Sequence, residues 1–226
     1  MNTFAPAAAR PLSADEPIHR RAARYRLPGW LLGAAVAVLF ASLFLPYWRI
    51  TMYAPQYPDG LTVTTYVDRL GGRVNEVDIL NHYIGMKPLE DAAPLERRFG
   101  VYLIAAMALL VVAAVWVHRP LAAALALPAA IYPIVFLFDV QFWLADFGLH
   151  LDPHAPLNLS VRPFVPHVLG VGHIGQFETV AWPCEGLVLA AVATLFIVAG
   201  LWLQRKAYKP LRGHAEPANA RGGQRK

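Results

Sequence analysis

The chain is poor in charged residues. Only 15% of its 226 residues are Asp, Glu, Lys or Arg, whereas average soluble domains carry about 25%. Hydrophobic residues make up 57% of the chain. So few charges cannot cover the surface of a soluble globule of this length. The composition therefore excludes an ordinary soluble domain and indicates an integral membrane protein.

Cysteine and the common catalytic motifs are almost absent. Cys184 is the single cysteine, so neither an internal disulfide nor a cysteine-based metal cage can form. We expect Cys184 to be a small buried residue, with one soft metal ligand as the alternative. The sequence has no G-x-S-x-G, P-loop, H-E-x-x-H or C-x-x-C, and the lack of C-x-x-C-H argues against c-type haem. We expect no enzymatic activity.

Long apolar runs are what the chain does contain. Four of them approach the roughly 20 helical residues that cross a bilayer. We predict helices rather than strands, because lipid offers no partner for unpaired backbone groups. The predicted transmembrane helices cover residues 30–47, 101–117, 121–144 and 186–203. The first is interpreted as an uncleaved signal anchor, since its apolar stretch is longer than that of a cleaved signal peptide.

The basic residues lie where they indicate the orientation of these helices. They are concentrated in residues 1–28, at the short turn around Arg119 and in residues 206–226. By the positive-inside rule, both termini are cytoplasmic in a bacterial inner membrane, and residues 48–99 and 146–185 form outward loops. We expect 29–205 to be the folded domain and both tails to be disordered. The basic excess lies beside the bilayer, so no nucleic acid is expected as a partner.

The two outward loops are expected to fold together into a small cap. "WRITMYA" and "GLTVTTYVDRL" alternate like strands, and "PQYPDG" between them predicts the turn of a hairpin. "EVDILNHYIGMKPLED" has Val77, Leu80 and Ile84 at helical spacing and ends at Gly85 and Pro88. In the second loop, "LNLSVRPFVP" predicts an extended strand and "HVLGVGHIGQFETVAWP" a mixture of strand and turn. The predicted fold is an all-α membrane protein with four transmembrane helices and a small α+β cap.

Histidine and methionine in the outward loops suggest a transition-metal site. Imidazole suits copper, zinc and iron, and thioether sulfur favours Cu(I). His82 and Met86 are four residues apart, so one helical turn would place both on the same face. In the alternative interpretation Gly85 ends the helix, Met86 packs at the bilayer interface and His82 makes a polar contact.

The segment "DVQFWLADFGLHLDPHAP" is the second candidate. Asp139, Asp146 and His150 fall close to one helical stripe, and Asp152 and His154 follow closely. A carboxylate often orients a ligating histidine. An acidic residue near the membrane boundary costs free energy, so Asp139 is a candidate for a functional role. The alternative is a helix stop in which Asp152 caps local backbone groups. The predicted metal ligands are His82, Met86, His150 and His154, with Asp139, Asp146 and Asp152 in support.

Four phrases resemble the landmarks of a little-characterised family of bacterial four-helix inner-membrane proteins. They are "APQYPDGL", "LNHYIGMKPLE", "DFGLHLDPHAP" and "ETVAWP", and the resemblance covers about residues 30–205. It implies an association with copper handling and nitrous-oxide-reductase maturation. It also implies two motifs, one with His82, Tyr83, Gly85 and Met86, the other with Asp146, His150, Asp152, Pro153 and His154. The family often has tyrosine where this chain has Phe147, so no phenol is expected to act there.

Two functions of different kinds are compatible with these features. The first is an inner-membrane accessory protein that binds or passes copper through its cap, with a periplasmic cuproenzyme or a copper chaperone as partner. The second is a structural or scaffold subunit that binds no metal. Haem b ligation and transport through Asp139 are weaker alternatives, because the helices carry no deep histidine pair and no internal repeat. The distance between "NHYIGMK" and "HLDPH" decides whether one metal site is feasible, since metal bonds are about 2.0–2.3 Å long.

Overall fold

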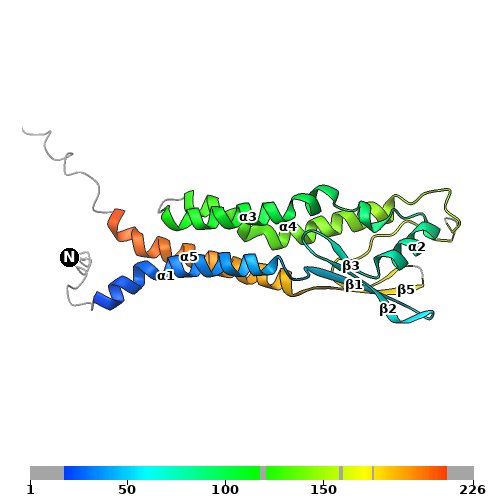
Figure 1. The fold of residues 1–226 in the computed structure, drawn as a ribbon, viewed down its shortest axis with the longest axis horizontal. Coiled ribbons are helices and arrows are strands. Elements are labelled where there is room, and N and C mark those ends of the chain that lie inside the picture. Colours follow the sequence, from blue (N-terminus) through cyan, green and yellow to red (C-terminus); the bar gives the residue numbers. More distant parts are fainter. Residues whose placement is uncertain (1–17, 118–120, 158–159, 175, 213–226) are drawn as a thin grey trace, which may run out of the picture.

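The structure, a computed structural model, describes residues 18–117, 121–157, 160–174 and 176–212. Long helices form one half of the molecule and a β-sheet with a short helix forms the other (Figure 1). The elements in chain order are α1 (Ile18–Ser42), β1 (Trp48–Ala54), β2 (Tyr57–Thr65), β3 (Leu70–Gly72), α2 (Val74–Ile84), the 3-10 turn η1 (Leu89–Asp91), α3 (Pro94–Trp116), α4 (Leu121–Leu149), β4 (Gly170–Ile174), β5 (Phe177–Pro183) and α5 (Glu185–Arg212).

Three helices in the described part of the chain are long and apolar enough to cross a membrane. They are Pro94–Trp116, Leu121–Leu149 and Glu185–Ala207. The apolar part of α1, Arg26–Ser42, is shorter, with 17 residues. The prediction of a multi-pass membrane protein is therefore confirmed.

The first predicted helix ends earlier than expected, at Ser42 instead of residue 47. Pro46 disfavours helical backbone at the residue before it. Tyr47 then leaves the helix altogether, because its backbone N–H donates to the carbonyl of Thr65 in β2 at 2.8 Å. At its other end α1 already begins at Ile18, so the predicted disordered tail 1–28 is helical over its last part. Residues 1–17 lie outside the described residues.

The second and third helices extend further outward than their apolar runs. α3 begins at Pro94, a residue favoured in the first helical turn, and α4 continues to Leu149. With 29 residues α4 is about 43 Å long, which exceeds the roughly 30 Å of a hydrocarbon core. α5 likewise continues to Arg212, into the predicted C-terminal tail. The cap therefore lies at the beginning of α3 and the end of α4.

A single antiparallel sheet joins the two long loops, 48–99 and 146–185. Its strand order is β3-β2-β1-β5-β4, so β1 from the first loop pairs with β5 from the second. The predicted hairpin is confirmed by the pairing of β1 with β2, and the predicted single cap by the pairing of Ile50 with Ala181. The strand expected in "LNLSVRPFVP" does not form in the part of this segment that is described. Pro163 and Pro166 lack the N–H groups that a ladder requires.

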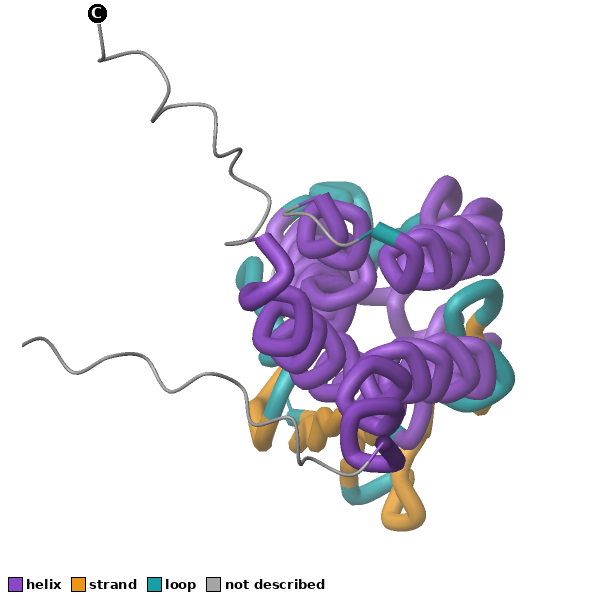
Figure 2. Tube along the Cα trace, turned by 90° about the vertical axis from the view of Figure 1, so that its left-hand side faces the viewer, coloured by secondary structure: helices purple, strands orange, loops and turns teal. Residues whose placement is uncertain are grey.

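Two hydrophobic cores meet on α4. One lies within the helix bundle and includes Leu39, Ile104 and Ile197, and the other lies under the sheet around Trp48 and Val77. Phe136 and Leu137 of α4 pack against both cores. α1 lies beside α5 and α3 beside α4 along the bundle (Figure 1), and the strands gather on one side of it (Figure 2). The cap is therefore packed onto the bundle through α4.

Candidate functional site

A cavity of about 780 Å³ lies between the cap and the outer part of the bundle. The inner face of the sheet, α2 with the loop after it, and the outer parts of α3 and α4 enclose it. Most of its lining is aliphatic or aromatic. Representative residues are Trp48 and Ile50 of β1, Leu80 of α2, Leu103 of α3, and Phe136 and Trp143 of α4.

Residues of α4 that lie on one face of the helix form one wall of the cavity. Tyr132, Phe136, Asp139, Trp143 and Phe147 all line the cavity and recur every three or four residues, so they form one stripe of the helix. Asp139 is the one acidic residue in that stripe. Asp139, Asp146 and His150, which were predicted to share one face of the helix, are therefore separated. Asp139 lines the cavity, whereas Asp146 and His150 lie at the end of α4.

Alternate residues of β1 form another wall of the cavity. Trp48, Ile50 and Met52 of β1 line the cavity, as expected for every second residue of a strand. The Trp48 indole N–H donates to the carbonyl of Val168 at 2.6 Å, which ties β1 to the chain before β4. The Gln141 side chain accepts a hydrogen bond from the backbone N–H of Val168 at 3.0 Å, which ties that same segment to α4. Through Val168, these bonds connect the sheet to α4.

The cavity reaches the molecular surface beside α3 and α4. Phe99 and Leu103 of α3 and Val135 of α4 line it and are also exposed, with 54%, 54% and 51% of their surface accessible. All three are apolar, and all three lie on helices that are long and apolar enough to cross a membrane. The rim of the cavity is thus the kind of surface that faces lipid.

A few polar groups interrupt the apolar lining near this opening. The Asp139 carboxyl lies close to Glu96 and to Trp143, and no Lys or Arg among the described residues forms an ion pair with it. Arg97 donates through its Nη2 to the carbonyl of Glu90. The Arg97 Nε and the Trp143 indole nitrogen are buried without a well-formed hydrogen bond in the described chain, but the indole N–H lies close enough to the Asp139 carboxyl to interact with it as a donor. Leaving a buried donor unpaired costs about 1–3 kcal/mol, so the Arg97 Nε is a donor that a ligand could satisfy.

The "NHYIGMK" segment does not form the helical His–Met pair. α2 ends at Ile84, and Gly85 adopts left-handed backbone with φ of 81°. The Met86 N–H donates to the carbonyl of Asn81 at 2.9 Å, which closes the helix end as a Schellman motif does. The His82 side chain is exposed, whereas Met86 lines the cavity. Gly85 therefore ends the helix, as the alternative interpretation expected, but Met86 lines the cavity where that interpretation placed it at the bilayer interface, and the polar contact of His82 stays a prediction.

The two predicted motifs nevertheless touch each other through their backbones. The Asp152 N–H donates to the carbonyl of Gly85 at 2.7 Å, and the Leu157 N–H donates to the carbonyl of Tyr83 at 3.0 Å. A Cβ atom on Gly85 would lie only 2.7 Å from the Asp152 carbonyl oxygen. The two motifs come from separate loops in the sequence, and in the structure the segment after α2 is in direct contact with the segment after α4.

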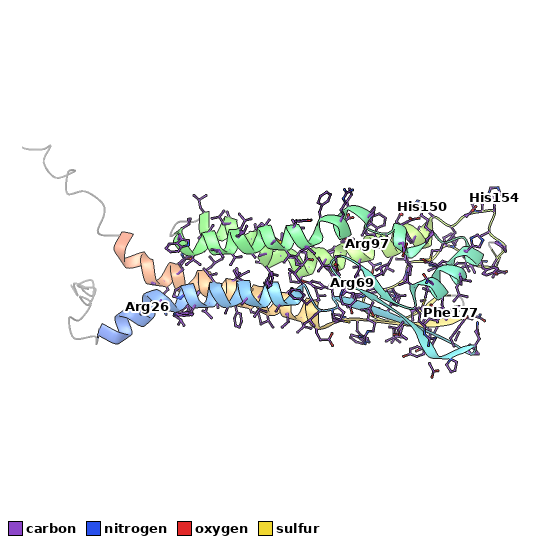
Figure 3. All side chains as sticks on the ribbon, in the orientation of Figure 1. Arg26, Arg69, Arg97, His150, His154 and Phe177 are labelled. Carbon is purple, nitrogen blue, oxygen red and sulfur yellow. The ribbon has the colours of Figure 1, made fainter. Side chains whose placement is uncertain are left out.

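The histidines of the second motif pair with neighbouring carboxylates. His150 Nδ1 lies 3.0 Å from Asp146, which is also 3.7 Å from the Lys87 ammonium, and His154 Nδ1 lies 3.2 Å from Asp152. These histidine side chains are 68% and 91% exposed. Figure 3 places His154 at the tip of the cap, beyond His150 and away from Arg97.

Asp152 also acts as the local cap that the alternative interpretation described. Its Oδ1 accepts the backbone N–H of His154 at 2.8 Å. That bond, with the one from the His154 ring, lowers the pKa of the Asp152 carboxyl below its usual value. Within the described residues, no group of three or more His, Cys, Asp or Glu side chains is gathered as a metal would need. The four-ligand metal site stays a prediction.

Cys184 matches the expected buried role. It is buried just before α5, its backbone N–H donates to the carbonyl of Tyr47 at 2.9 Å, and burial raises the pKa of its thiol.

The cavity itself, with Glu96, Arg97 and Trp143, was missed by sequence reasoning. The available signal was the aromatic residues of α4 at helical spacing, which the sequence analysis did not single out. No family model, curated protein or solved structure matches the chain. The resemblance to a copper-associated family therefore stays a prediction, and the function is inferred from the geometry.

Proposed function

We propose that this is a four-span protein of the bacterial inner membrane, with its cap outside, that binds an amphiphilic lipid in the cavity. The observation that carries the proposal is a large apolar cavity whose rim is made of exposed apolar residues on two membrane-type helices.

Helix lengths support four spans at a common level. The ends of the apolar segments away from the cap are Arg26, Trp116, Leu121 and Ala207. A crossing of about 20 residues, counted from these positions toward the cap, arrives near Pro46, Arg97, Gln141 and Glu185. In every case the chain there turns polar or leaves the helix. The 17 apolar residues of α1 are completed by residues 43–46, which are less compact than a helix and therefore cover the remaining thickness.

The distribution of charge supports the orientation. Arg26 lies at the end of the bundle opposite the cap (Figure 3). Arg205 and Lys206 lie in the last part of α5 at the same end, and further basic residues follow them in the sequence. This end therefore carries more Lys and Arg near the membrane than the cap end, where Arg49, Arg97 and Arg98 lie. The positive-inside rule assigns that end to the cytoplasm, which leaves the cap on the periplasmic side.

The position of the cavity relative to this level supports an amphiphilic ligand. On α4 the lining extends from Tyr132 to Phe147, on both sides of Gln141, so the cavity straddles the outer membrane interface. The rim residues Phe99, Leu103 and Val135 lie on the hydrocarbon side of that level. A volume of 780 Å³ falls in the range of about 300–1,000 Å³ that ligand pockets occupy, and a mostly apolar lining with a few polar groups is their usual composition. An acyl chain of the outer leaflet can therefore enter sideways.

Blocking the rim tests this function. The full chain is purified in mild detergent, and the phospholipid that it retains is counted by native mass spectrometry. We expect wild type to retain lipid and Val135→Trp, which fills the rim, to lose most of it. Ile134→Trp is the matched control, because Ile134 is equally exposed on the same helix but does not line the cavity. Lipid-free wild type, or equal retention by both variants, would contradict the proposal.

We propose copper handling as a second function, and one observation favours it over a plain scaffold. The backbone bonds between Asp152 and Gly85 bring both candidate motifs onto one outer surface. On that surface His82, His150 and His154 are exposed, so a periplasmic cuproenzyme or copper chaperone could contact them. Purified protein is loaded with Cu(I), desalted and analysed for metal. Retention of copper by wild type and its loss in the His150→Ala, His154→Ala double variant would support this function, and copper-free wild type would eliminate it without affecting lipid binding.

A further inference from the structure

We infer that the cavity selects a phospholipid whose head group carries both a primary ammonium and a phosphate. This inference rests on the proposed lipid-binding function and adds the identity of the head group. It comes from the polar groups that line the cavity near the rim, which include two carboxyl groups that form no ion pair with a described residue and the buried Arg97 Nε, which has no acceptor.

The depth of these groups matches that of a lipid head. Arg97 lies at the level where α3 leaves the proposed hydrocarbon region, and Asp139 of α4 lies within one turn of Gln141 at the same level. Below them the lining is apolar, with Phe99, Leu103 and Tyr132. A lipid that enters from the outer leaflet places its acyl chains against this lower part. Its head group then meets the polar residues.

The carboxyl groups of Asp139 and Glu96 at this level form no ion pair with a described residue. They lie close enough for their charges to repel each other. Two neighbouring carboxyls favour a cation between them, because it removes their mutual repulsion. A primary ammonium also offers three hydrogen-bond donors, which the quaternary ammonium of choline does not.

A buried donor at this level lacks an acceptor in the described chain. Arg97 is held in place by its bond to the Glu90 carbonyl, and its buried Nε remains unpaired within the described chain. The Trp143 indole nitrogen, on the facing helix, also lacks a well-formed hydrogen bond, but it interacts with the Asp139 carboxyl, so Arg97 is the donor available for a phosphate. A guanidinium with a free N–H suits phosphate in both charge and shape. Both halves of an aminophospholipid head therefore have a partner in this cavity.

A competition between head groups tests the inference. The full chain is reconstituted in nanodiscs that hold equal amounts of phosphatidylethanolamine, phosphatidylcholine and phosphatidylglycerol with identical acyl chains. The protein is then released and its retained lipids are identified by native mass spectrometry. We expect phosphatidylethanolamine to be enriched about tenfold over phosphatidylglycerol, the effect of one charge-assisted hydrogen bond.

Variants separate the two halves of the head group. Asp139→Asn should abolish the preference for phosphatidylethanolamine, whereas Arg97→Gln should lower the retention of all three lipids alike, since all contain phosphate. Asp146→Asn is the matched control, because Asp146 lies on the same helix outside the cavity. Glu96→Gln, at an exposed position, serves as a second carboxyl variant if Asp139→Asn does not fold.

The outcomes distinguish this inference from the function on which it rests. Equal retention of the three lipids, with retention still blocked by Val135→Trp, would overturn the head-group inference and leave lipid binding intact. Enrichment of phosphatidylglycerol or phosphatidylcholine would overturn it as well. Retention of no lipid at all would overturn both proposals.

Discussion

Gly85 is the position where a single methyl group should separate the two contacting motifs. Its φ of 81° is a left-handed conformation, which costs a residue with a Cβ atom about 1–2 kcal/mol. The new Cβ would also lie 2.7 and 2.8 Å from the carbonyl oxygen and nitrogen of Asp152. Both are backbone atoms, so the "LDPHAP" segment must move as a whole. That movement breaks the hydrogen bond from the Asp152 N–H to the Gly85 carbonyl, which is worth about 1 kcal/mol.

Gly85→Ala should therefore lower the free energy of unfolding by about 2–3 kcal/mol. Two glycines in the same chain serve as matched controls. Gly170 also has positive φ, 90°, but a Cβ there meets no atom within 4 Å, so Gly170→Ala measures the conformational cost alone. Gly33 lies in α1 with open space around it, and Gly33→Ala should be neutral or stabilising by up to about 1 kcal/mol.

The measurement has a global and a local part. Equilibrium unfolding in detergent, followed by tryptophan fluorescence, gives the free energy for each variant. Hydrogen exchange of a peptide covering residues 150–157 reports whether the segment has left its seat on Gly85. Equal destabilisation by Gly85→Ala and Gly170→Ala, with unchanged exchange in this peptide, would refute the reasoning.

Three further predictions concern the cap and its connection to the bundle. Because the pKa of Asp152 is lowered, its bonds to His154 stabilise this turn above pH 3.8, and that contribution is lost as the pH falls through the lowered pKa. An NMR titration midpoint of the Asp152 carboxyl at or above 3.8 would contradict this prediction. Cys184 is buried with a raised pKa, so maleimide should label it slowly in folded protein and rapidly after unfolding, and fast labelling of the native state would count against its burial. Gln141→Leu removes the acceptor of the Val168 N–H and should cost about 1–3 kcal/mol in the unfolding assay, whereas no loss would mean that this bond does not hold the cap to α4.

The sequence predicted those parts of the fold that depend on residues close together in the chain, and it predicted only in general terms those that depend on residues far apart. The apolar runs predicted the long helices, and "PQYPDG" between two alternating segments predicted the β1–β2 hairpin, because both signals are local. The pairing of β1 with β5 joins residues more than a hundred positions apart, as Ile50 and Ala181 illustrate. Only the general expectation that long loops pack together pointed to it.

The candidate site divides in the same way. The sequence by itself determined that His82, Met86, His150 and His154 lie outside the long apolar runs, and that Gly85 was able to end a helix, because composition and local backbone preference decide those features. Tertiary structure alone decided that Met86 turns into the cavity while His82 stays exposed, since a left-handed residue between them redirects the chain. It also decided that Asp139 lies near Glu96 and Trp143 in an apolar cavity. A cavity is enclosed by residues from distant segments, and no local pattern specifies the distance at which they meet.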